Sequence, residues 1–191
     1  MAGTTKDRIS ALDRERIAIA PYDANWPLLY TEIEKQIKQM VPRQLMQRIS
    51  HIGSTAVPGL SGKPIVDVQV EVNDLERVRE TIAPLMEEAG YEFFWRPTMG
   101  DAAPFYAWFI LRNEAKERIA HVHMVESGQA SADRIVFRDY LRSHPEESAR
   151  YEALKQDLAK RFPKDRASYT ANKGSYVSEV LRKARGEKMR K

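Results

Sequence analysis

The sequence predicts an α+β protein in which a mixed or antiparallel sheet comes first and a group of helices comes last. Residues 65–72 alternate valine with polar side chains, which is typical of a strand with one buried face. From about Asp133 onward the pattern is that of helices, split at His144-Pro145 and at Phe162-Pro163-Lys164. Strand patterns followed by helical patterns therefore fix the predicted fold class.

The first elements follow from local spacing. Residues 1–16 are polar and aperiodic, and we expect them to form a flexible arm. Apolar residues recur every three or four positions from Trp26 to Met40, which predicts an amphipathic helix ending before Pro42. Residues 47–54 predict a short strand, and the turn formers of 55–64 connect it to the strand at 65–72.

A second helix is predicted from an Asn73 cap through Ala89, with Pro84 able to bend it and Gly90 ending it. Three more strands are predicted at residues 91–95, 105–112 and 119–125. We expect one domain over residues 17–184, with its sheet part ending at about 128 and its helical part starting at about 132, followed by a basic tail at 185–191.

Composition excludes several classes of protein. The 191 residues include no cysteine, so disulfide frameworks, thiolate zinc sites and thiol nucleophiles are excluded. The N-terminal residues MAGTTKDRIS lack the apolar run of a signal peptide, and no stretch of 18 apolar residues occurs. We therefore expect a cytoplasmic protein without a membrane partner.

The positive charge is concentrated at one end of the chain. The formal net charge is +4, yet the last ten residues alone carry six positive charges and one negative charge. The rest of the chain is about neutral, so charge gives no reason to expect a nucleic-acid partner.

One short region carries the candidate chemistry. The Gly53-Ser54 turn offers backbone N–H groups and a hydroxyl that can hold phosphate oxygens, and Asp67 on the next strand can hold a divalent cation beside them. Nucleotidyl transfer needs both parts. The stretch 59–64 is not a Walker A loop, because its glycines are too close together and Pro64 occupies the Ser/Thr position.

The run HIGSTAVPGLSGKPIVDVQVEV, the lead-in IAPYDANWP, the later HVHMVE and the terminal YTANKGSYVSEVLRKAR closely resemble the GrpB family over roughly residues 17–184. This resemblance implies a nucleotidyltransferase-like mixed sheet flanked by helices, with a C-terminal helical segment. It carries the phosphate and metal roles over to Gly53, Ser54 and Asp67. Some family members are joined to dephospho-coenzyme A kinase, which implies a link to the coenzyme A pathway.

The metal site departs from the pattern of nucleotidyltransferases. Gln69 stands where a second metal carboxylate is expected, and Glu71 lies about 13 Å from Asp67 along an extended strand, too far to substitute. His121 and His123 lie on one face of their strand and could complete a site for Mg²⁺, Mn²⁺ or Zn²⁺. Alternatively, one of the two histidines could act as a general base. Cross-strand pairing without a metal is the structural alternative.

Lys63 and Lys173 are the predicted phosphate-binding cations. Tyr169, Lys173 and Tyr176 fall at helical spacing on one side of a helix. The family resemblance puts this helix near the cleft, where the amine could pair with a phosphate and the Tyr169 ring could stack on a base.

These observations predict an enzyme that binds a nucleotide, such as a nucleoside triphosphate, or another phosphorylated small molecule together with a divalent metal. Two alternatives stay open. One is a non-catalytic module that binds the ligand, which the presence of Gln69 favours. In that case Ser54 could serve merely as a cap of the turn. The other is a metal-dependent phosphohydrolase with water as the nucleophile.

Overall fold

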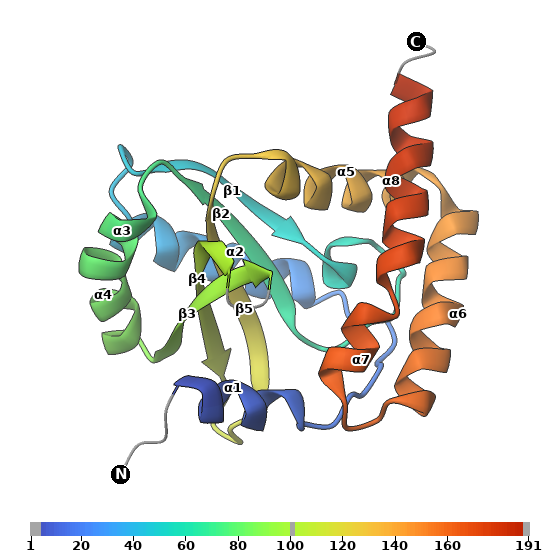
Figure 1. Cartoon of the computed structure of the whole chain (residues 1–191), viewed down its shortest axis with the longest axis horizontal. Coiled ribbons are helices and arrows are strands. Elements are labelled where there is room, and N and C mark those ends of the chain that lie inside the picture. Colours follow the sequence, from blue (N-terminus) through green and yellow to red (C-terminus); the bar gives the residue numbers. More distant parts are fainter. Residues whose placement is uncertain (1–4, 100–101, 189–191) are drawn as a thin grey trace. The chain divides into compact units, whose positions relative to one another are not determined.

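The computed structural model describes residues 5–99 and 102–188 and divides into two compact units, each considered by itself (Figure 1). The sheet unit comprises Asp23–Ala56 and Ile65–Ile135; the helical unit comprises the chain up to Tyr22, Val57–Pro64 and the chain from Val136. Residues 1–4 of the predicted arm and 189–191 of the predicted basic tail lie outside the described residues.

The sheet unit contains a five-stranded mixed sheet of order β1-β2-β5-β4-β3. Its strands are β1 Met46–Ile52, β2 Val66–Val72, β3 Tyr91–Met99, β4 Ala102–Arg112 and β5 Arg118–Glu126. β2 and β5 run parallel, and the other three pairs are antiparallel. The α+β class and the existence of the five predicted strands are thus confirmed. Three bounds differ by more than one residue: β1 ends at Ile52, β3 continues to Met99, and β4 starts at Ala102.

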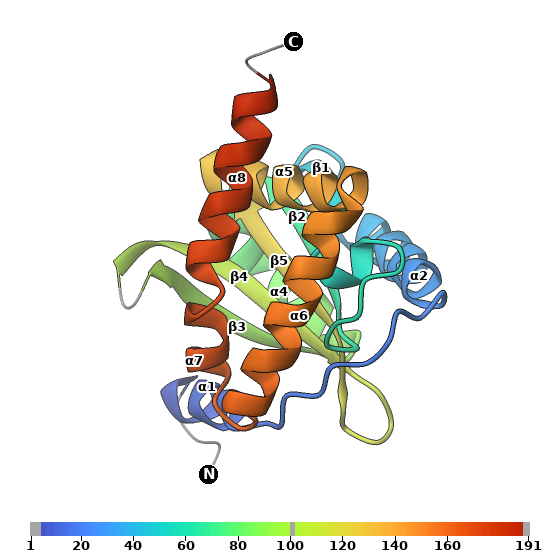
Figure 2. The same cartoon turned by 90° about the vertical axis from the view of Figure 1, so that its right-hand side faces the viewer.

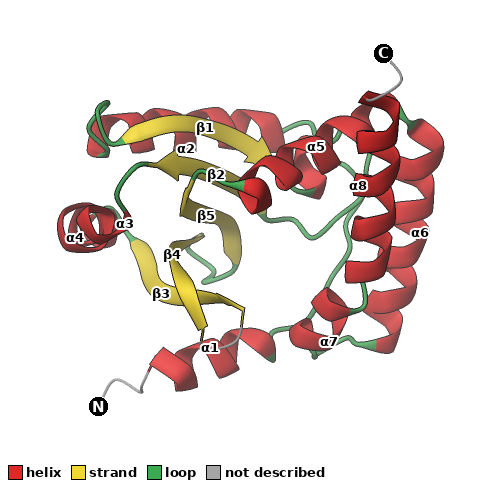
Figure 3. Ribbon diagram, turned by 45° about the horizontal axis from the view of Figure 1, so that its top comes forward, coloured by secondary structure: helices red, strands yellow, loops and turns green. Residues whose placement is uncertain are grey.

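The two faces of β2 differ as its alternation predicts. All four valines of β2 are 0% exposed. Helix α2, Trp26–Met40, lies against β1 and β2 on this face (Figure 3), where the ring of Tyr30 stacks on His51 of β1 at 4.8 Å. Pairing of His51 with Val68 puts both side chains on the same side of the sheet. This buried face anchors the strands that carry the candidate site on their opposite side.

The helix predicted at 73–89 is present but interrupted. It consists of α3 Leu75–Arg77, a π turn at Val78–Ile82 and α4 Ala83–Glu88. Pro84 has no N–H to continue the regular ladder, and the π turn precedes it. The predicted Asn73 cap is wrong: the extended residue is Asp74, whose carboxylate accepts from the backbone N–H of Arg77 at 2.9 Å. Gly90, at φ +90°, ends the helix as predicted.

The helices of the C-terminal half are α5 Gln129–Ser143, α6 Pro145–Arg161, α7 Arg166–Ala171 and α8 Gly174–Lys188. The two breaks predicted at prolines are confirmed. The first turns of α5 belong to the sheet unit. Across the described residues, no helix has the length and apolar character needed to span a membrane.

The segment expected to form a flexible arm, residues 1–16, contains a helix, α1, Thr5–Asp13. The side chain of Leu12 is only 5% exposed there, so the expectation was wrong at this helix. A polar segment with so few apolar residues has no apolar periodicity from which a helix could be predicted.

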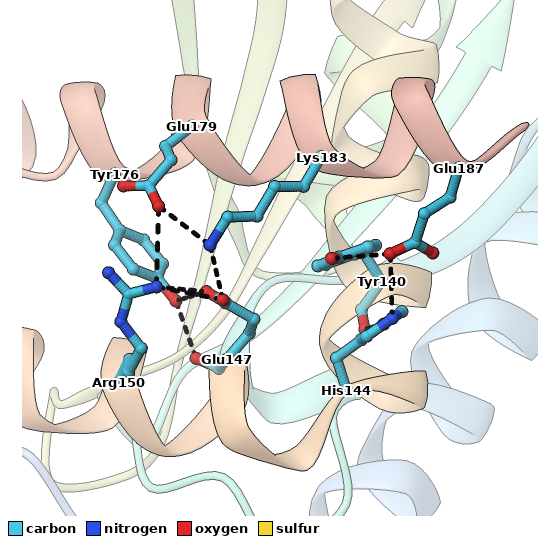
Figure 4. A network of polar contacts seen from close by, with 8 residues as sticks. All are labelled: Tyr140, His144, Glu147, Arg150, Tyr176, Glu179, Lys183 and Glu187. Atoms are coloured by element: carbon cyan, nitrogen blue, oxygen red, sulfur yellow. Dashed lines mark hydrogen bonds and ion pairs between the residues drawn. The ribbon is translucent and has the colours of Figure 1, made fainter. Parts of the chain in front are cut away.

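Helices α6 and α8 run alongside each other in the helical unit and are joined by ion pairs (Figures 2 and 4). The carboxylate of Glu147 accepts from Lys183 Nζ at 2.6 Å, from Tyr176 Oη at 3.0 Å and from Arg150 Nη1 at 3.0 Å. These donors, Lys183 first, lower the pKa of Glu147. An apolar cluster surrounds the network and contains Val57, Leu60, Tyr140, Leu141, Tyr151, Tyr176, Val180 and Ala184.

Candidate functional site

Three side chains converge on the second face of the sheet. The parallel register pairs Asp67 with His121 and Gln69 with His123, so these side chains point to the same side. Oδ1 of Asp67 lies 3.3 Å from Nδ1 of His121 and 3.7 Å from Nε2 of His123. The structure therefore brings together the residues that the sequence suggested as metal ligands, and we call them the Asp-His-His triad.

The glycine of the predicted phosphate turn lies directly against this triad. β1 ends at Ile52, which pairs with Asp67. Gly53 follows with φ +74°, and a Cβ at this position would lie 2.6 Å from Oδ2 of Asp67. Only glycine fits here, because both the backbone angle and the close carboxylate exclude a side chain. Ser54 then begins a short 3₁₀ turn, Ser54–Ala56, which contacts β1 and β2.

The triad carries a carboxylate beside a neutral imidazole at neutral pH. Burial by itself would raise the pKa of Asp67, but hydrogen bonds from His121 and His123 and their charges lower it well below its usual range. Burial lowers the pKa of His123; Asp67 opposes this shift, and Arg134 and Arg96 add to it. The Asp67 side chain is 31% exposed, so a solute can reach the triad from its side.

The donor atoms are spaced so that one metal ion could be held if the side chains draw slightly closer together. A tetrahedral ion with ligands at about 2.0–2.2 Å holds its donor atoms roughly 3.3–3.6 Å apart. The two separations from Asp67 Oδ1 are 3.3 and 3.7 Å, and the donor atoms of all three residues lie within 4.8 Å of one another. Two imidazoles and one carboxylate suit Zn²⁺ or Mn²⁺ better than Mg²⁺, which prefers oxygen ligands.

Gln69 and Glu71 lie on the same face of β2 as Asp67 but are buried. Their residues are 1% and 8% exposed, since the start of α5 covers them. Nε2 of Gln69 donates to Glu71 Oε1 at 3.2 Å and to the carbonyl of Ser131 at 3.0 Å, and its Oε1 accepts from Arg134 at 3.3 Å. Glu71 pairs with Arg48 at 3.2 Å. Gln69 is thus engaged with α5, and neither residue joins the donor set of the triad.

Aromatic and cationic residues that the sequence analysis did not select border the triad. The ring of Trp108 lies 5.1 Å from His121, and that of Tyr106 lies 5.8 Å from His123. Arg96 lies opposite Tyr106 in the β3–β4 pair. Strand alternation predicts that Tyr106 and Trp108 share one face, but local sequence does not predict that β4 pairs with β5.

The predicted phosphate-binding residues outside the sheet unit form a separate cluster. Nζ of Lys173 lies 4.4 Å and Nζ of Lys63 lies 5.6 Å from the ring centre of Tyr169. Tyr169 is 1% exposed, and burial raises its pKa to about 12. A ring this buried cannot stack on a base, so that expectation was wrong. Tyr176 packs in the core, stacked on Tyr151 at 5.3 Å.

The single helix side expected for Tyr169, Lys173 and Tyr176 was also wrong. Helix α7 ends at Ala171 and α8 begins at Gly174, so Lys173 lies in the turn between them. Helical spacing persists in sequence across this turn, and for that reason the pattern gave no sign of the break.

A buried lysine belongs to the same unit. Lys155 is 2% exposed, its Nζ donates to the carbonyl of Ser61, and it lies 4.8 Å from the ring centre of Tyr151. Burial, with a smaller effect from Lys173, lowers its pKa to about 7. Its position on the apolar stripe of α6, between Tyr151 and Leu158, is the sequence signal that could have revealed it.

Comparison with known proteins assigns the family. The profile of the GrpB protein family matches residues 16–183. The chain belongs to the GrpB family. It is 32% identical to the glutamate-rich protein GrpB of Alkalihalophilus pseudofirmus over 170 residues, which cover 89% of this chain and 97% of that protein.

Other GrpB relatives extend the comparison. A UPF0157 protein of Pseudomonas aeruginosa is 35% identical over 178 residues, covering 93% of this chain and 71% of that protein. The crystal structure of GrpB from Enterococcus faecalis superposes with a TM-score of 0.74 at 27% identity, covering 90% of this chain and 99% of that one. The dephospho-CoA kinase of Mycolicibacterium paratuberculosis is 26% identical, but the match spans only 46% of its length.

Proposed function

We propose that this GrpB-family chain is a metal-dependent enzyme that transfers a nucleotidyl group, or otherwise reacts at phosphorus, on a nucleotide or another phosphorylated small molecule. Asp67, His121 and His123 would hold one divalent cation. Gly53 and Ser54 would hold a phosphate beside it. A bound cation at this place would neutralise the charge that develops on the phosphate oxygens.

The observation that carries the proposal is the convergence of three donors from two neighbouring strands on one partly exposed corner. Hydrogen bonds from the two histidines keep the pKa of Asp67 low and burial lowers the pKa of His123, and both directions favour the deprotonated forms that bind metals. Gly53 allows the turn to approach Asp67 closely, so a phosphate held by the turn would lie next to the cation.

Gln69 supports a second candidate, a module that binds the ligand without catalysis. Nucleotidyl transfer commonly uses two metals held by paired carboxylates. Gln69 occupies the position of the second carboxylate and hydrogen-bonds to Ser131 and Arg134. A single cation could still support hydrolysis with water as the nucleophile, so the identity of the product decides among the three functions.

We place Lys63 and Lys173 in the proposal as a second anion-binding group in the helical unit, supported by their position around one ring. The link to coenzyme A is part of the same proposal, because matching regions occur in dephospho-CoA kinases. Dephospho-coenzyme A therefore belongs among the compounds to be tested.

The test combines ligand stabilisation with product analysis. Wild type is incubated with ATP, CTP, GTP, UTP or dephospho-coenzyme A and with Mg²⁺, Mn²⁺ or Zn²⁺, and the melting temperature is recorded. Each nucleotide is also combined with dephospho-coenzyme A, whose hydroxyl groups can accept the nucleotidyl group as pyrophosphate leaves. Reaction mixtures are assayed for pyrophosphate and phosphate. Asp67→Asn is the site variant, and His144→Ala, in the helical unit, is a control for the loss of a titratable side chain outside the triad.

A metal-dependent rise in melting temperature with release of pyrophosphate, absent in Asp67→Asn, is the expected result. Release of phosphate alone would assign a hydrolase. Stabilisation by a nucleotide without metal or turnover would assign the binding module. No stabilisation by any combination would contradict all three.

A further inference from the structure

Two arginines from different elements border the Asp-His-His triad. Arg96 comes from β3, and its Cζ lies 4.9 Å from the ring centre of Trp108, which pairs with His123 in the β4–β5 register. Arg134 comes from α5, and its Nη1 donates to Gln69 Oε1 at 3.3 Å. Gln69 pairs with His123 in the β2–β5 register, and Tyr106, which lies opposite Arg96 in the β3–β4 pair, has its ring 5.8 Å from that of His123, so both arginines lie beside the triad.

Neither arginine has an acidic partner within the described part of the chain. Among the residues that the structure describes, no carboxylate forms an ion pair with Arg96 or Arg134. Asp67 is engaged by the two histidines, and Glu71, the other acid on this face of β2, pairs with Arg48. Counting only side chains that the structure describes, the two arginines therefore add positive charge to this corner that no ion pair offsets.

Hydrogen-bond donors at this corner also lack acceptors. The Nε–H of Arg96 and the Nε1–H of Trp108 are buried and find no partner within the described ranges 5–99 and 102–188. A buried donor without an acceptor destabilises the fold, so such groups are usually completed by a ligand, ion or water. The indole N–H of Trp108, the guanidinium group of Arg96 with its unpartnered Nε–H, and the guanidinium group of Arg134 together favour an anion with several oxygens.

We infer that Arg96 and Arg134, with the indole N–H of Trp108, form an oxyanion-binding site of the phosphate class beside the triad. N–H donors that come from three separate elements approach from several directions, which matches the oxygens of a phosphate better than the two of a carboxylate. The inference rests on the proposed function only in assigning this phosphate to the substrate of the metal site.

Inorganic pyrophosphate is the probe. Its binding to EDTA-treated protein is measured by isothermal titration calorimetry for wild type, Arg96→Gln, Arg134→Gln and the control Arg79→Gln. Arg79 lies on the π turn with a half-exposed side chain, so its loss removes one charge from the same unit outside the site. Circular dichroism and melting curves check that each variant is folded.

We expect wild type to bind pyrophosphate, each site variant to bind at least tenfold more weakly, and Arg79→Gln to stay within twofold. Wild-type protein that does not bind, or Arg134→Gln that binds like wild type, would overturn the inference. Zn²⁺ titrations of the same proteins separate it from the proposed function. Metal binding without pyrophosphate binding would refute the arginine site alone, whereas arginine-dependent pyrophosphate binding without metal binding would refute only the metal enzyme.

Discussion

Gly53 is the residue on which the shape of the triad depends most directly. A methyl group there would meet the carboxylate of Asp67 at 2.6 Å and would also strain a backbone at φ +74°. We predict that Gly53→Ala lowers the free energy of unfolding by about 2–4 kcal/mol and abolishes divalent-metal binding, because Asp67 must move. Urea denaturation and a metal titration measure the two effects.

Gly90→Ala is the matched control, because Gly90 has φ +90° but nothing within 4 Å of the added methyl. It should cost only about 1–2 kcal/mol of backbone strain and leave metal binding intact. Equal behaviour of the two variants would show that contact with Asp67 is unimportant.

Lys155 gives the helical unit a distinct pH dependence. Its pKa falls from 10.5 to about 7 on folding, mainly because its ammonium group is buried. Between these values the unfolded chain holds more protons, so the contribution of Lys155 to stability rises with pH, by at most ~1.4 kcal/mol per pH unit. Lys155→Met should remove this dependence.

Denaturation of both proteins from pH 7 to 9.5 tests this prediction. The stability of wild type should increase relative to Lys155→Met as the pH rises, since all other groups titrate alike in the two proteins. A difference that stays constant over this range would mean that Lys155 keeps an ordinary pKa.

At the scale of elements, Gln69 shows how α5 and β2 depend on each other. Replacing its amide with a carboxylate puts an oxygen against Glu71 Oε1 and the Ser131 carbonyl, where Nε2 now donates at 3.2 and 3.0 Å. We predict that Gln69→Glu loses about 2–4 kcal/mol of stability, which contact with Arg134 offsets only in part. Metal stoichiometry should stay unchanged.

Calorimetry and urea denaturation of Gln69→Glu test this prediction. A variant as stable as wild type that binds a second cation would instead identify position 69 as a metal-ligand position that the amide has disabled.

Elements with a strong local period were predictable, and the contacts between them were not. The valine alternation of 65–72 and the stripe of 26–40 correspond to β2 and α2 almost residue for residue. Local sequence does not tell which of two adjacent cap-forming residues, Asn73 or Asp74, caps the helix, because that depends on which of them adopts the extended backbone. The π turn also leaves no clear sequence signal.

For the candidate site, too, the residues on each strand were predictable from the sequence and the contacts between strands were not. Alternation placed His121 and His123 on one face, but only the parallel pairing of β2 with β5 brings them to Asp67. The burial of Gln69 and the approach of Arg96 and Arg134 depend on α5 and β3, which lie far away in sequence. Such contacts are set by tertiary packing and not by local pattern.

Over the whole molecule, the chain forms two compact units, and the triad lies within the sheet unit alone. The loop Val57–Pro64, which carries Lys63, belongs to the helical unit although it connects β1 with β2. The predicted phosphate-binding residues are therefore divided between the units, with Gly53 and Ser54 in one and Lys63 and Lys173 in the other. Binding by each group can be measured separately.

The most direct test of the account is a calorimetric titration of EDTA-treated wild type with Zn²⁺ and with Mn²⁺, repeated on the double variant His121→Ala/His123→Ala and on His144→Ala. We predict one site per chain in wild type and in His144→Ala, and none in the double variant. Absence of binding in wild type, or binding that the double variant retains, would contradict the central claim.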